Sequence, residues 1–372
     1  MKHVVFAHRK LSFGGGERVL IEQVAALADL PVEVSILFRK EPGKRDIEAE
    51  LRARHPGIRE ILHVPGPVGA FRWLRRNRPD LLVLCNQKGV QRALPWLDRT
   101  GPHLPTVVTL HEHYDRHLRK YRGIRDLVDG WVCTYDFTAA VHDRLGPAPC
   151  SIIHPLYPRP EVLAATPQAR AEARQGLGLP AEGPVVGYVR QIDGRKDPVS
   201  VLRLAEALDA QSGGHLHLLF AGREEAEASR ALDAALAASP LRNRVRRLGP
   251  QDDLAPAFMA LDLYVMTSRN EGFFPIALIE ALERGVPILA PTVGGIGTVL
   301  RDGDGGFLLA KPDDRQPVSH ALLLAGAARI APLLADGHAW EEQRRRAHAF
   351  GTGLTRGYDA AARFREAVAP WL

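Results

Sequence analysis

Short apolar runs alternate with amphipathic segments along the first half of the chain. The apolar runs are nearly continuous in Val, Leu and Ile, which is typical of strands that are buried on both faces of a parallel sheet. The segments between them, such as 17–28 and 137–145, have helical periodicity. The predicted strands are His3–Ala7, Val32–Phe38, Ile58–Val64, Leu81–Leu84, Thr106–Leu110, Gly130–Thr134 and Ser151–His154. This alternation predicts a parallel sheet with helices on both faces.

A proline-rich stretch, His154–Pro160, interrupts the pattern and predicts an interdomain linker, because prolines remove backbone donors and favour extended geometry. The alternation then restarts, and the chain is helical from about Pro312. The predicted strands of the second half are Pro184–Arg190, His215–Ala221, Arg244–Leu248, Leu261–Met266, Pro287–Ala290 and Gly306–Leu309. The predicted fold is α/β, with two tandem doubly wound domains at 1–158 and 159–352. Ligands of such sheets bind beyond the carboxyl ends of the strands, so two facing domains would enclose a cleft.

Composition is that of a soluble globular protein, with 45% hydrophobic and 25% charged residues among 372. No apolar run approaches the ~20 residues of a membrane span, and the N-terminal run is too short for a secretory signal. The three cysteines, Cys85, Cys133 and Cys150, have no metal-type spacing and are interpreted as free thiols in a reducing compartment. We therefore expect a cytoplasmic protein.

Positive charge is concentrated in the first half of the chain. Residues 1–158 contain 24 Lys and Arg against 17 Asp and Glu, a net charge of +7, whereas the remainder has a net charge of −1. The charge gathers at Arg72, Arg75, Arg76 and Arg78, and again at Arg116, Arg119, Lys120, Arg122 and Arg125. Either cluster could be a solvated helix face, or could face anionic lipid, nucleic acid or an anionic acceptor. Nucleic acid is not expected as a partner, because interleaved aromatic residues are lacking. For segment 116–125 we predict weak peripheral attachment to the inner face of the membrane.

The stretch Thr267–Gly295 carries the most chemical information. A predicted strand runs into a polar loop with Glu271 and then into a helix with Pro275 in its first turn and Glu280 further along. The first backbone N–H groups of a helix have no internal partner and bind anions. A carboxylate within the helix can accept hydrogen bonds from sugar hydroxyls. Phosphate and hydroxyls together describe a nucleotide sugar.

Two more candidate sites could contact phosphate. Gly14, Gly15 and Gly16 follow the first predicted strand, and glycines let the backbone approach an anion closely. They match neither the dinucleotide fingerprint nor the P-loop, so a flexible turn is the alternative. Arg190 and Lys196 follow the strand 184–190 and could neutralise a diphosphate leaving group, or could be two surface cations. Arg195 between them is interpreted as solvent-facing.

A histidine follows another predicted strand. His111 comes directly after 106–110 and could contact a sugar hydroxyl or an acceptor, although a structural role is equally compatible with its position. His113 could be confused with it. Metal binding is not predicted, because no third ligand stands at a suitable spacing. No pair of carboxylates resembles the acid and nucleophile of a glycosidase.

Taken in order, these motifs resemble the retaining glycosyltransferases of the GT-B fold, family 4 (group 1), over nearly the whole chain. The strongest motif is Glu271–Glu280, followed by the glycine pair at Gly294. The supporting motifs are Gly14-Gly-Gly-Glu-Arg-Val-Leu20, Thr109-Leu-His111, Gly187-Tyr-Val-Arg190 with Lys196, and Asp262-Leu-Tyr-Val-Met-Thr-Ser268. The resemblance implies transfer of a sugar from a UDP-, GDP- or similar donor to an unknown acceptor, with retention of configuration. It implies no metal, no other cofactor and no covalent nucleophile.

The resemblance also implies a role for each candidate residue. Glu280 would bind the ribose hydroxyls, Glu271 the hydroxyls of the donor sugar, and His111 the sugar from the opposite domain. The residues implied to bind the donor phosphates are Gly15 and Gly16, Arg190 and Lys196, and the helix opening at Phe274, Pro275 and Ile276. A C-terminal helix at about 353–372 is expected to cross back onto the first domain.

The chain departs from the family pattern at two places. Eight residues separate Glu271 from Glu280 where the family has seven, so the first Glu of the motif falls at Gly272 and Phe273 is the extra residue. Gly297 and Thr298 stand where the family has Pro-Glu. These departures motivate the alternative of a degenerate, non-catalytic nucleotide-sugar-binding protein. A nucleotide-sugar epimerase of the same fold is a further alternative.

Overall fold

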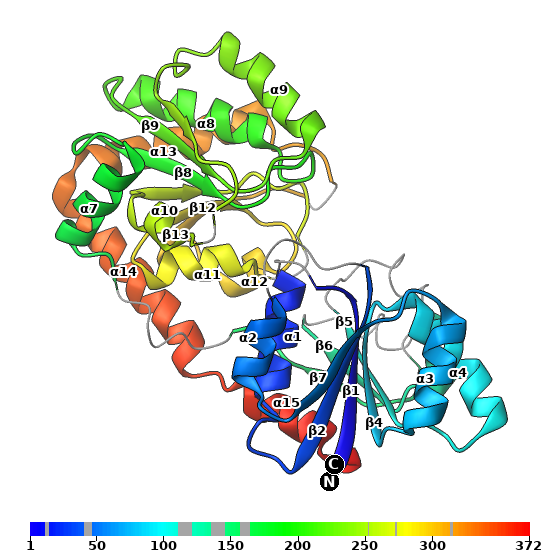
Figure 1. The fold of residues 1–372 in the computed structure, drawn as a ribbon. Coiled ribbons are helices and arrows are strands. Elements are labelled where there is room, and N and C mark those ends of the chain that lie inside the picture. Colours follow the sequence, from blue (N-terminus) through cyan, green and yellow to red (C-terminus); the bar gives the residue numbers. More distant parts are fainter. Residues whose placement is uncertain are drawn as a thin grey trace. The chain divides into compact units, whose positions relative to one another are not determined.

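The chain forms two compact units in the computed structural model. The described residues are 1–11, 15–40, 47–110, 121–134, 146–156, 164–251, 253–271, 274–312 and 315–372. Unit 1 consists of Met1–Tyr157 and Tyr358–Leu372, and unit 2 consists of Pro158–Gly357 (Figure 1). The division falls within the proline-rich stretch, one residue before the boundary expected from the sequence. The expected helix 137–145 lies outside the described residues.

Unit 1 is built on a parallel sheet of seven strands in the order β3-β2-β1-β4-β5-β6-β7. The strands are β1 (Lys2–Lys10), β2 (Val32–Lys40), β3 (Ile58–His63), β4 (Leu81–Cys85), β5 (Thr106–Leu110), β6 (Gly130–Cys133) and β7 (Cys150–Ile152). Its described helices include α1 (Gly15–Ala25), α2 (Ile47–Arg54), α3 (Pro67–Asn77), α4 (Lys88–Thr100), η2 (Arg125–Leu127), α15 (Ala360–Val368) and η3 (Ala369–Trp371). Each strand predicted in this half of the sequence is present, with shifts of a few residues at the ends.

Unit 2 repeats this architecture with six parallel strands in the order β10-β9-β8-β11-β12-β13. The strands are β8 (Val185–Val189), β9 (His217–Ala221), β10 (Val245–Arg247), β11 (Leu263–Val265), β12 (Ile288–Pro291) and β13 (Gly306–Leu309). The helices are α7 (Pro167–Leu177), α8 (Pro198–Gln211), α9 (Ala226–Ala237), α10 (Ala255–Met259), α11 (Ile276–Glu283), α12 (Ile296–Val299), α13 (His320–Ala335) and α14 (Gly337–Arg356). The strand order reverses between β8 and β11, and a sheet of this type binds ligands beyond the carboxyl ends of its strands at that point.

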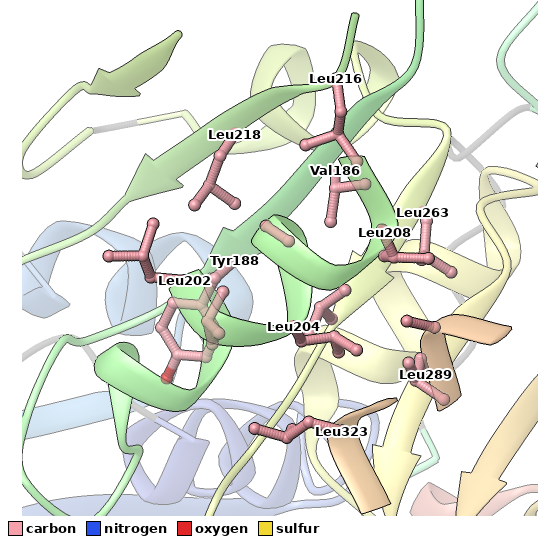
Figure 2. Close-up of a cluster of buried hydrophobic side chains, with 14 of the residues drawn as sticks. Val186, Tyr188, Leu202, Leu204, Leu208, Leu216, Leu218, Leu263, Leu289 and Leu323 are labelled. Carbon is pink, nitrogen blue, oxygen red and sulfur yellow. The ribbon is translucent and has the colours of Figure 1, made fainter. Parts of the chain in front are cut away.

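The core of unit 2 explains why its strands are apolar throughout. Every residue of β8 is buried, and Val186 and Tyr188 contribute to one cluster with side chains of neighbouring strands. The cluster also contains Leu204 and Leu208 of α8 and Leu323 of α13 (Figure 2). In unit 1, both faces of the sheet carry such a cluster. Central strands with covered faces require apolar residues at every position, which is the pattern in the sequence.

Helix α14 packs closely on the end of α11. The Thr355 hydroxyl donates to Glu283 Oε1 at 3.1 Å, and His348 Nδ1 lies 2.6 Å from the Glu283 carbonyl oxygen. A Cβ atom at Gly351 would lie 2.6 Å from the Glu283 nitrogen. These contacts hold residues 353–357 in unit 2, so the segment that belongs to unit 1 starts at Tyr358 and not at about 353.

The C-terminal segment after α14 is part of unit 1. Phe364 of α15 is buried, with its ring centroid 6.3 Å from that of Phe6 on β1. The backbone N–H of His154 donates to the Tyr358 hydroxyl at 2.8 Å. The end of the chain therefore completes the core of the first unit. In the described parts of the chain, no helix combines the length and apolar character needed to cross a membrane.

Two glycines of α14 give a matched test of the packing between α14 and α11. An alanine at Gly351 would push its Cβ against backbone atoms of Glu283 and Leu282, both at 2.6 Å. We expect Gly351→Ala to lower the free energy of unfolding by about 1–3 kcal/mol, the cost of overpacking. Gly353 has no described atom within 4 Å of the same position, so Gly353→Ala should raise stability by about 0.5–1 kcal/mol. Denaturant unfolding of both variants measures the difference, and equal stabilities would contradict the contact.

Candidate functional site

The loop between β8 and α8 turns a lysine side chain into the interior of unit 2. The backbone N–H of Lys196 donates to Asp193 Oδ1 at 2.9 Å, which closes a tight turn. Asp197, with a φ of 53°, then caps α8 by accepting from the backbone N–H of Ser200 at 3.4 Å, and it also accepts from the Ser200 hydroxyl at 2.9 Å. Because the backbone is fixed on both sides, Lys196 is held inward and is only 5% exposed.

The loop that follows β11 is fastened to this first loop. The Thr267 hydroxyl donates to the carbonyl oxygen of Asp197 at 2.8 Å. The backbone N–H of Arg269 donates to the carbonyl oxygen of Arg195 at 2.9 Å. Strands β8 and β11 are neighbours in the sheet, so both loops emerge at its carboxyl edge, where the strand order reverses.

A buried ion pair joins the two loops. The Lys196 ammonium group donates to Glu271 Oε1, and the Glu271 residue is 6% exposed. The Arg195 guanidinium lies 3.8 Å from Glu271 Oε2, although its side chain is 49% exposed. Arg195 is therefore solvent-facing, as expected, and also reaches the carboxylate. Two residues from separate sequence motifs, Lys196 and Glu271, are in direct contact.

Burial and charge act against each other in this pair. Burial lowers the pKa of Lys196 to about 8, and Glu271 only partly offsets this by favouring the charged ammonium. Burial alone would raise the pKa of Glu271, but the cations of Lys196 and Arg195 outweigh it and lower that pKa. Both groups are charged at neutral pH, and the ammonium group is the one that lies close to losing its proton.

Two glycines allow the backbone to approach the site residues. The φ of Gly222, directly after β9, is 146°, and a Cβ atom there would lie 1.9 Å from the carbonyl oxygen of Arg190. The φ of Gly294, after β12, is 58°, and a Cβ atom there would lie 2.6 Å from the carbonyl oxygen of Glu271. Only glycine fits either position. The sequence singles out Gly294 as part of a glycine pair but does not show which atom approaches it. Gly222 is not among the predicted residues, although its position directly after a predicted strand could have indicated it.

Helix α11 brings a second group of predicted residues to the same edge of the sheet. Phe274 and Pro275 are buried at its start, and no described side chain caps this end. Pro275 has no N–H, so the donors at this end are the backbone groups of Ile276 and Ala277. Glu280 is partly exposed one turn further along the helix. The helix start and Glu280 together offer N–H donors and a carboxylate acceptor.

Tyr264 of β11 lies among these charges and was not predicted. Its pKa is raised, mainly by complete burial and further by Glu271 and Glu280, while Arg190 acts in the opposite direction. The hydroxyl has no hydrogen-bond partner among the described residues. In the sequence, Tyr264 could have been recognised as the one aromatic residue with a polar group in an otherwise aliphatic strand.

The remaining predicted residues belong to unit 1. Gly15 and Gly16 are the first two residues of α1, the helix that follows β1. His111 comes directly after β5 and lies outside the described residues, as does Gly14. In unit 2, Gly272 and Phe273 also lie outside the described residues. The residues that the structure brings together are therefore those of unit 2: the cations of Lys196 and Arg195, the buried carboxylate of Glu271, and the start of α11. This set can bind an anion and accept hydrogen bonds from hydroxyl groups.

A double-mutant cycle tests the buried pair. Lys196→Met leaves the Glu271 carboxylate buried with Arg195 alone, and Glu271→Gln leaves an uncompensated ammonium. We expect each to lower the free energy of unfolding by about 3–5 kcal/mol. The double variant contains no buried charge and should recover at least about 2 kcal/mol of the summed loss. Additive effects in denaturant unfolding at neutral pH would contradict the pair.

Comparisons with known proteins agree with this architecture. The family model described as glycosyltransferase family 4 matches residues 13–157, and the model described as glycosyl transferases group 1 matches residues 169–325. A D-inositol 3-phosphate glycosyltransferase of Thermobispora bispora is 30% identical over 365 residues, covering 86% of this chain and 84% of the relative. A Mycobacterium tuberculosis protein of the same description is 28% identical, and its match covers 74% of this chain and 56% of the relative.

A solved structure shows the same fold. Anabaena Alr3699/HepE, determined in complex with UDP and glucose, superposes with a TM-score of 0.75 at 18% identity, covering 100% of this chain and 99% of that protein. The family expected from the sequence is confirmed by the two family models and by the 30% identical relative. The chain belongs to the glycosyltransferases of the GT-B fold, described by the group 1 and family 4 models.

Proposed function

We propose that the protein transfers a sugar from a nucleoside diphosphate to an acceptor, and that unit 2 binds the donor. The observation that carries the proposal is the buried contact between Lys196 and Glu271, with Arg190 directly after strand β8 in the same loop as Lys196. Cations and a carboxylate at the switch point of a doubly wound sheet suit a ligand with both phosphate and hydroxyl groups. The complex of Anabaena Alr3699/HepE with UDP and glucose supports the same donor class.

In the proposed reaction Lys196 and Arg190 bind the donor diphosphate. Negative charge grows on the diphosphate as its bond to the sugar breaks, and fixed cations stabilise that charge in the transition state. The pKa of Lys196 is lowered to about 8 by burial, and a bound diphosphate would raise it again. The backbone N–H groups at the start of α11 would donate to the same phosphates, and the phosphate contact of Gly15 and Gly16 stays a prediction of the family resemblance.

The two carboxylates would bind the hydroxyl groups of the donor. Glu280 on α11 would accept hydrogen bonds from the ribose. Glu271 would accept hydrogen bonds from the donor sugar once the Lys196 ammonium group binds the diphosphate in place of Glu271. The contact of Gly294 with the Glu271 backbone holds this carboxylate at the site, one residue before the position that the family motif assigns. The contact of His111 with the donor sugar stays a prediction of the family resemblance.

We infer a retaining reaction in which the acceptor attacks from the face that the diphosphate leaves. The leaving phosphate would help to remove the acceptor proton, so the enzyme needs no covalent nucleophile. Arg190 and Lys196 supply the positive charge that a metal ion would otherwise bring, and we propose that the reaction is independent of metal. The relatives described as D-inositol 3-phosphate glycosyltransferases make a phosphorylated cyclitol the first acceptor to test.

The positive charge of unit 1 suits a location at the inner face of an anionic membrane. Arg72, Arg75, Arg76 and Arg78 are exposed on α3 and at its C-cap, and none has a described carboxylate at ion-pair distance. Val68 of α3 is 51% exposed and Trp96 of α4 is 40% exposed. Exposed apolar side chains beside arginines are typical of surfaces that rest on lipid head groups. Of the predicted segment 116–125, Arg122 and Arg125 are exposed and residues 116–120 lie outside the described residues.

The assay for this function combines variants with a donor panel. We expect Lys196→Ala to reduce transfer at least about 100-fold, because one diphosphate cation is lost from the transition state. The charge-neutral pair Lys196→Met with Glu271→Gln should fold and also lack transfer. Arg203→Ala on the exposed face of α8 removes a cation elsewhere on unit 2 and is the matched control. Release of nucleoside diphosphate from UDP- and GDP-sugars, with and without acceptor, measures the effect.

The same assay separates the alternatives. Retention is read from the anomeric configuration of the product, and metal independence from unchanged transfer after chelation. A new nucleotide sugar formed from donor alone would favour the epimerase. Donor binding without turnover would favour the non-catalytic protein. Near-normal transfer by Lys196→Ala would overturn the proposed site.

Flotation with vesicles tests the membrane surface. Reversing Arg72, Arg75 and Arg76 to Glu should abolish binding to phosphatidylglycerol vesicles, because each cation near an anionic surface contributes about 1 kcal/mol. Reversing Arg203, Arg230 and Arg242 on unit 2 changes the net charge equally and is the control. Binding that is absent in the unmodified protein, or that persists in the first variant, would contradict the assignment.

A further inference from the structure

Two of the three cysteines are in contact in unit 1. The Sγ atoms of Cys133 and Cys150 are 3.1 Å apart. Cys133 is the last residue of β6, and Cys150 is the first residue of the neighbouring strand β7. The register places Cys150 opposite Trp131, two residues before Cys133, so both side chains point to the same face of the sheet. Their spacing in the sequence does not suggest a pair, and the expectation from the sequence is separate free thiols.

The distance between the sulfur atoms is that of a hydrogen-bonded contact. It exceeds the disulfide bond length of ~2.05 Å by about 1 Å, so bond formation requires a small movement. Strand β7 has three residues and pairs with β6 at the edge of the sheet. An edge strand held by one neighbour can make this adjustment more easily than a central strand.

The two thiols differ in exposure and in the direction of their pKa shifts. The hydrogen bond with Cys133 lowers the pKa of Cys150 and outweighs the opposing effect of burial. The same hydrogen bond, together with burial, raises the pKa of Cys133. Cys150 is also partly exposed, whereas Cys133 is fully buried. Cys150 therefore has the character of an attacking thiolate, and Cys133 that of the thiol that completes the bond.

We propose that Cys133 and Cys150 are a modification site at which a peroxide forms a reversible disulfide between β6 and β7. The Cys150 thiolate attacks one oxygen of hydrogen peroxide, the O–O bond breaks, and the released hydroxide becomes water on taking up a proton. Cys150 is then a sulfenic acid. The sulfur of Cys133 attacks the Cys150 sulfur, the S–O bond breaks, and the hydroxide leaves as water with the Cys133 proton. Two thiols and one peroxide give one disulfide and two waters.

The disulfide would fix strand β7 to β6, and β7 leads to His154, which binds the C-terminal segment. Two residues after β7, the backbone N–H of His154 donates to the Tyr358 hydroxyl at 2.8 Å. Tyr358 is the first residue of the segment that returns to unit 1. Oxidation would therefore fix β7 on β6 and with it the attachment point of Tyr358. This inference is independent of the proposed donor site, which lies in unit 2.

Peptide mapping of the full-length protein tests the site. The native protein is treated with a small excess of hydrogen peroxide, its remaining thiols are alkylated, and it is digested without reduction. We expect one cross-linked peptide pair that joins Cys133 to Cys150, a protein mass lower by two hydrogen atoms, and reversal by dithiothreitol. Cys85, on β4, should be alkylated, and Cys85→Ser should form the same bond.

Single variants assign the order of the steps. Cys133→Ser should leave a sulfenic acid on Cys150 that dimedone captures, and Cys150→Ser should leave Cys133 as a thiol. Alkylation of both cysteines in the oxidised native protein would overturn the proposal, as would a bond to Cys85 or over-oxidation of Cys150 without a cross-link. Because the decisive measurement uses the unmodified protein, it does not depend on the folding of a variant.

Discussion

The buried pair between Lys196 and Glu271 is the interaction on which the candidate site depends. Taking an ammonium group and a carboxylate out of water costs several kcal/mol each, and only close contact between them offsets that cost. The contact requires two loops from neighbouring strands to meet in one arrangement. The hydrogen bonds from Thr267 to Asp197 and from Arg269 to Arg195 provide it. Gly222 and Gly294 let the segments after β9 and β12 pack closely against Arg190 and Glu271.

The strands and the position of the site could be predicted because their signals are local. A strand that is covered on both faces needs apolar residues throughout, and β4, β5 and β8 are buried at every position. A ligand edge follows from parallel strands alone, which put all carboxyl ends on one side. The apolar pattern therefore places Lys196 and Glu271 at that edge, although it does not reveal their contact. Each follows a strand that the apolar pattern identifies.

The pairings could not be predicted, because they depend on strand order and register. Lys196 and Glu271 are 75 residues apart and meet because β8 pairs with β11, which is not its neighbour in the chain. Cys133 and Cys150 meet only in the register that sets Cys150 opposite Trp131. A glycine in the sequence shows freedom of φ but not the atom that approaches it, so the carbonyl of Arg190 beside Gly222 was not foreseen.

Arg195, the second cation beside Glu271, allows Lys196 to leave the ion pair when a ligand binds. If Lys196 were the sole partner of Glu271, a ligand that drew the ammonium group away would leave a buried carboxylate without compensation, at a cost of several kcal/mol. The Arg195 guanidinium lies 3.8 Å from the other carboxylate oxygen, and its side chain is half exposed. It therefore has room to move closer to the Glu271 carboxylate. In the proposed reaction, Lys196 can therefore turn to the donor diphosphate while Arg195 continues to neutralise Glu271. The carboxylate stays ionised and able to accept hydrogen bonds from sugar hydroxyls, which is the protonation state that donor recognition requires.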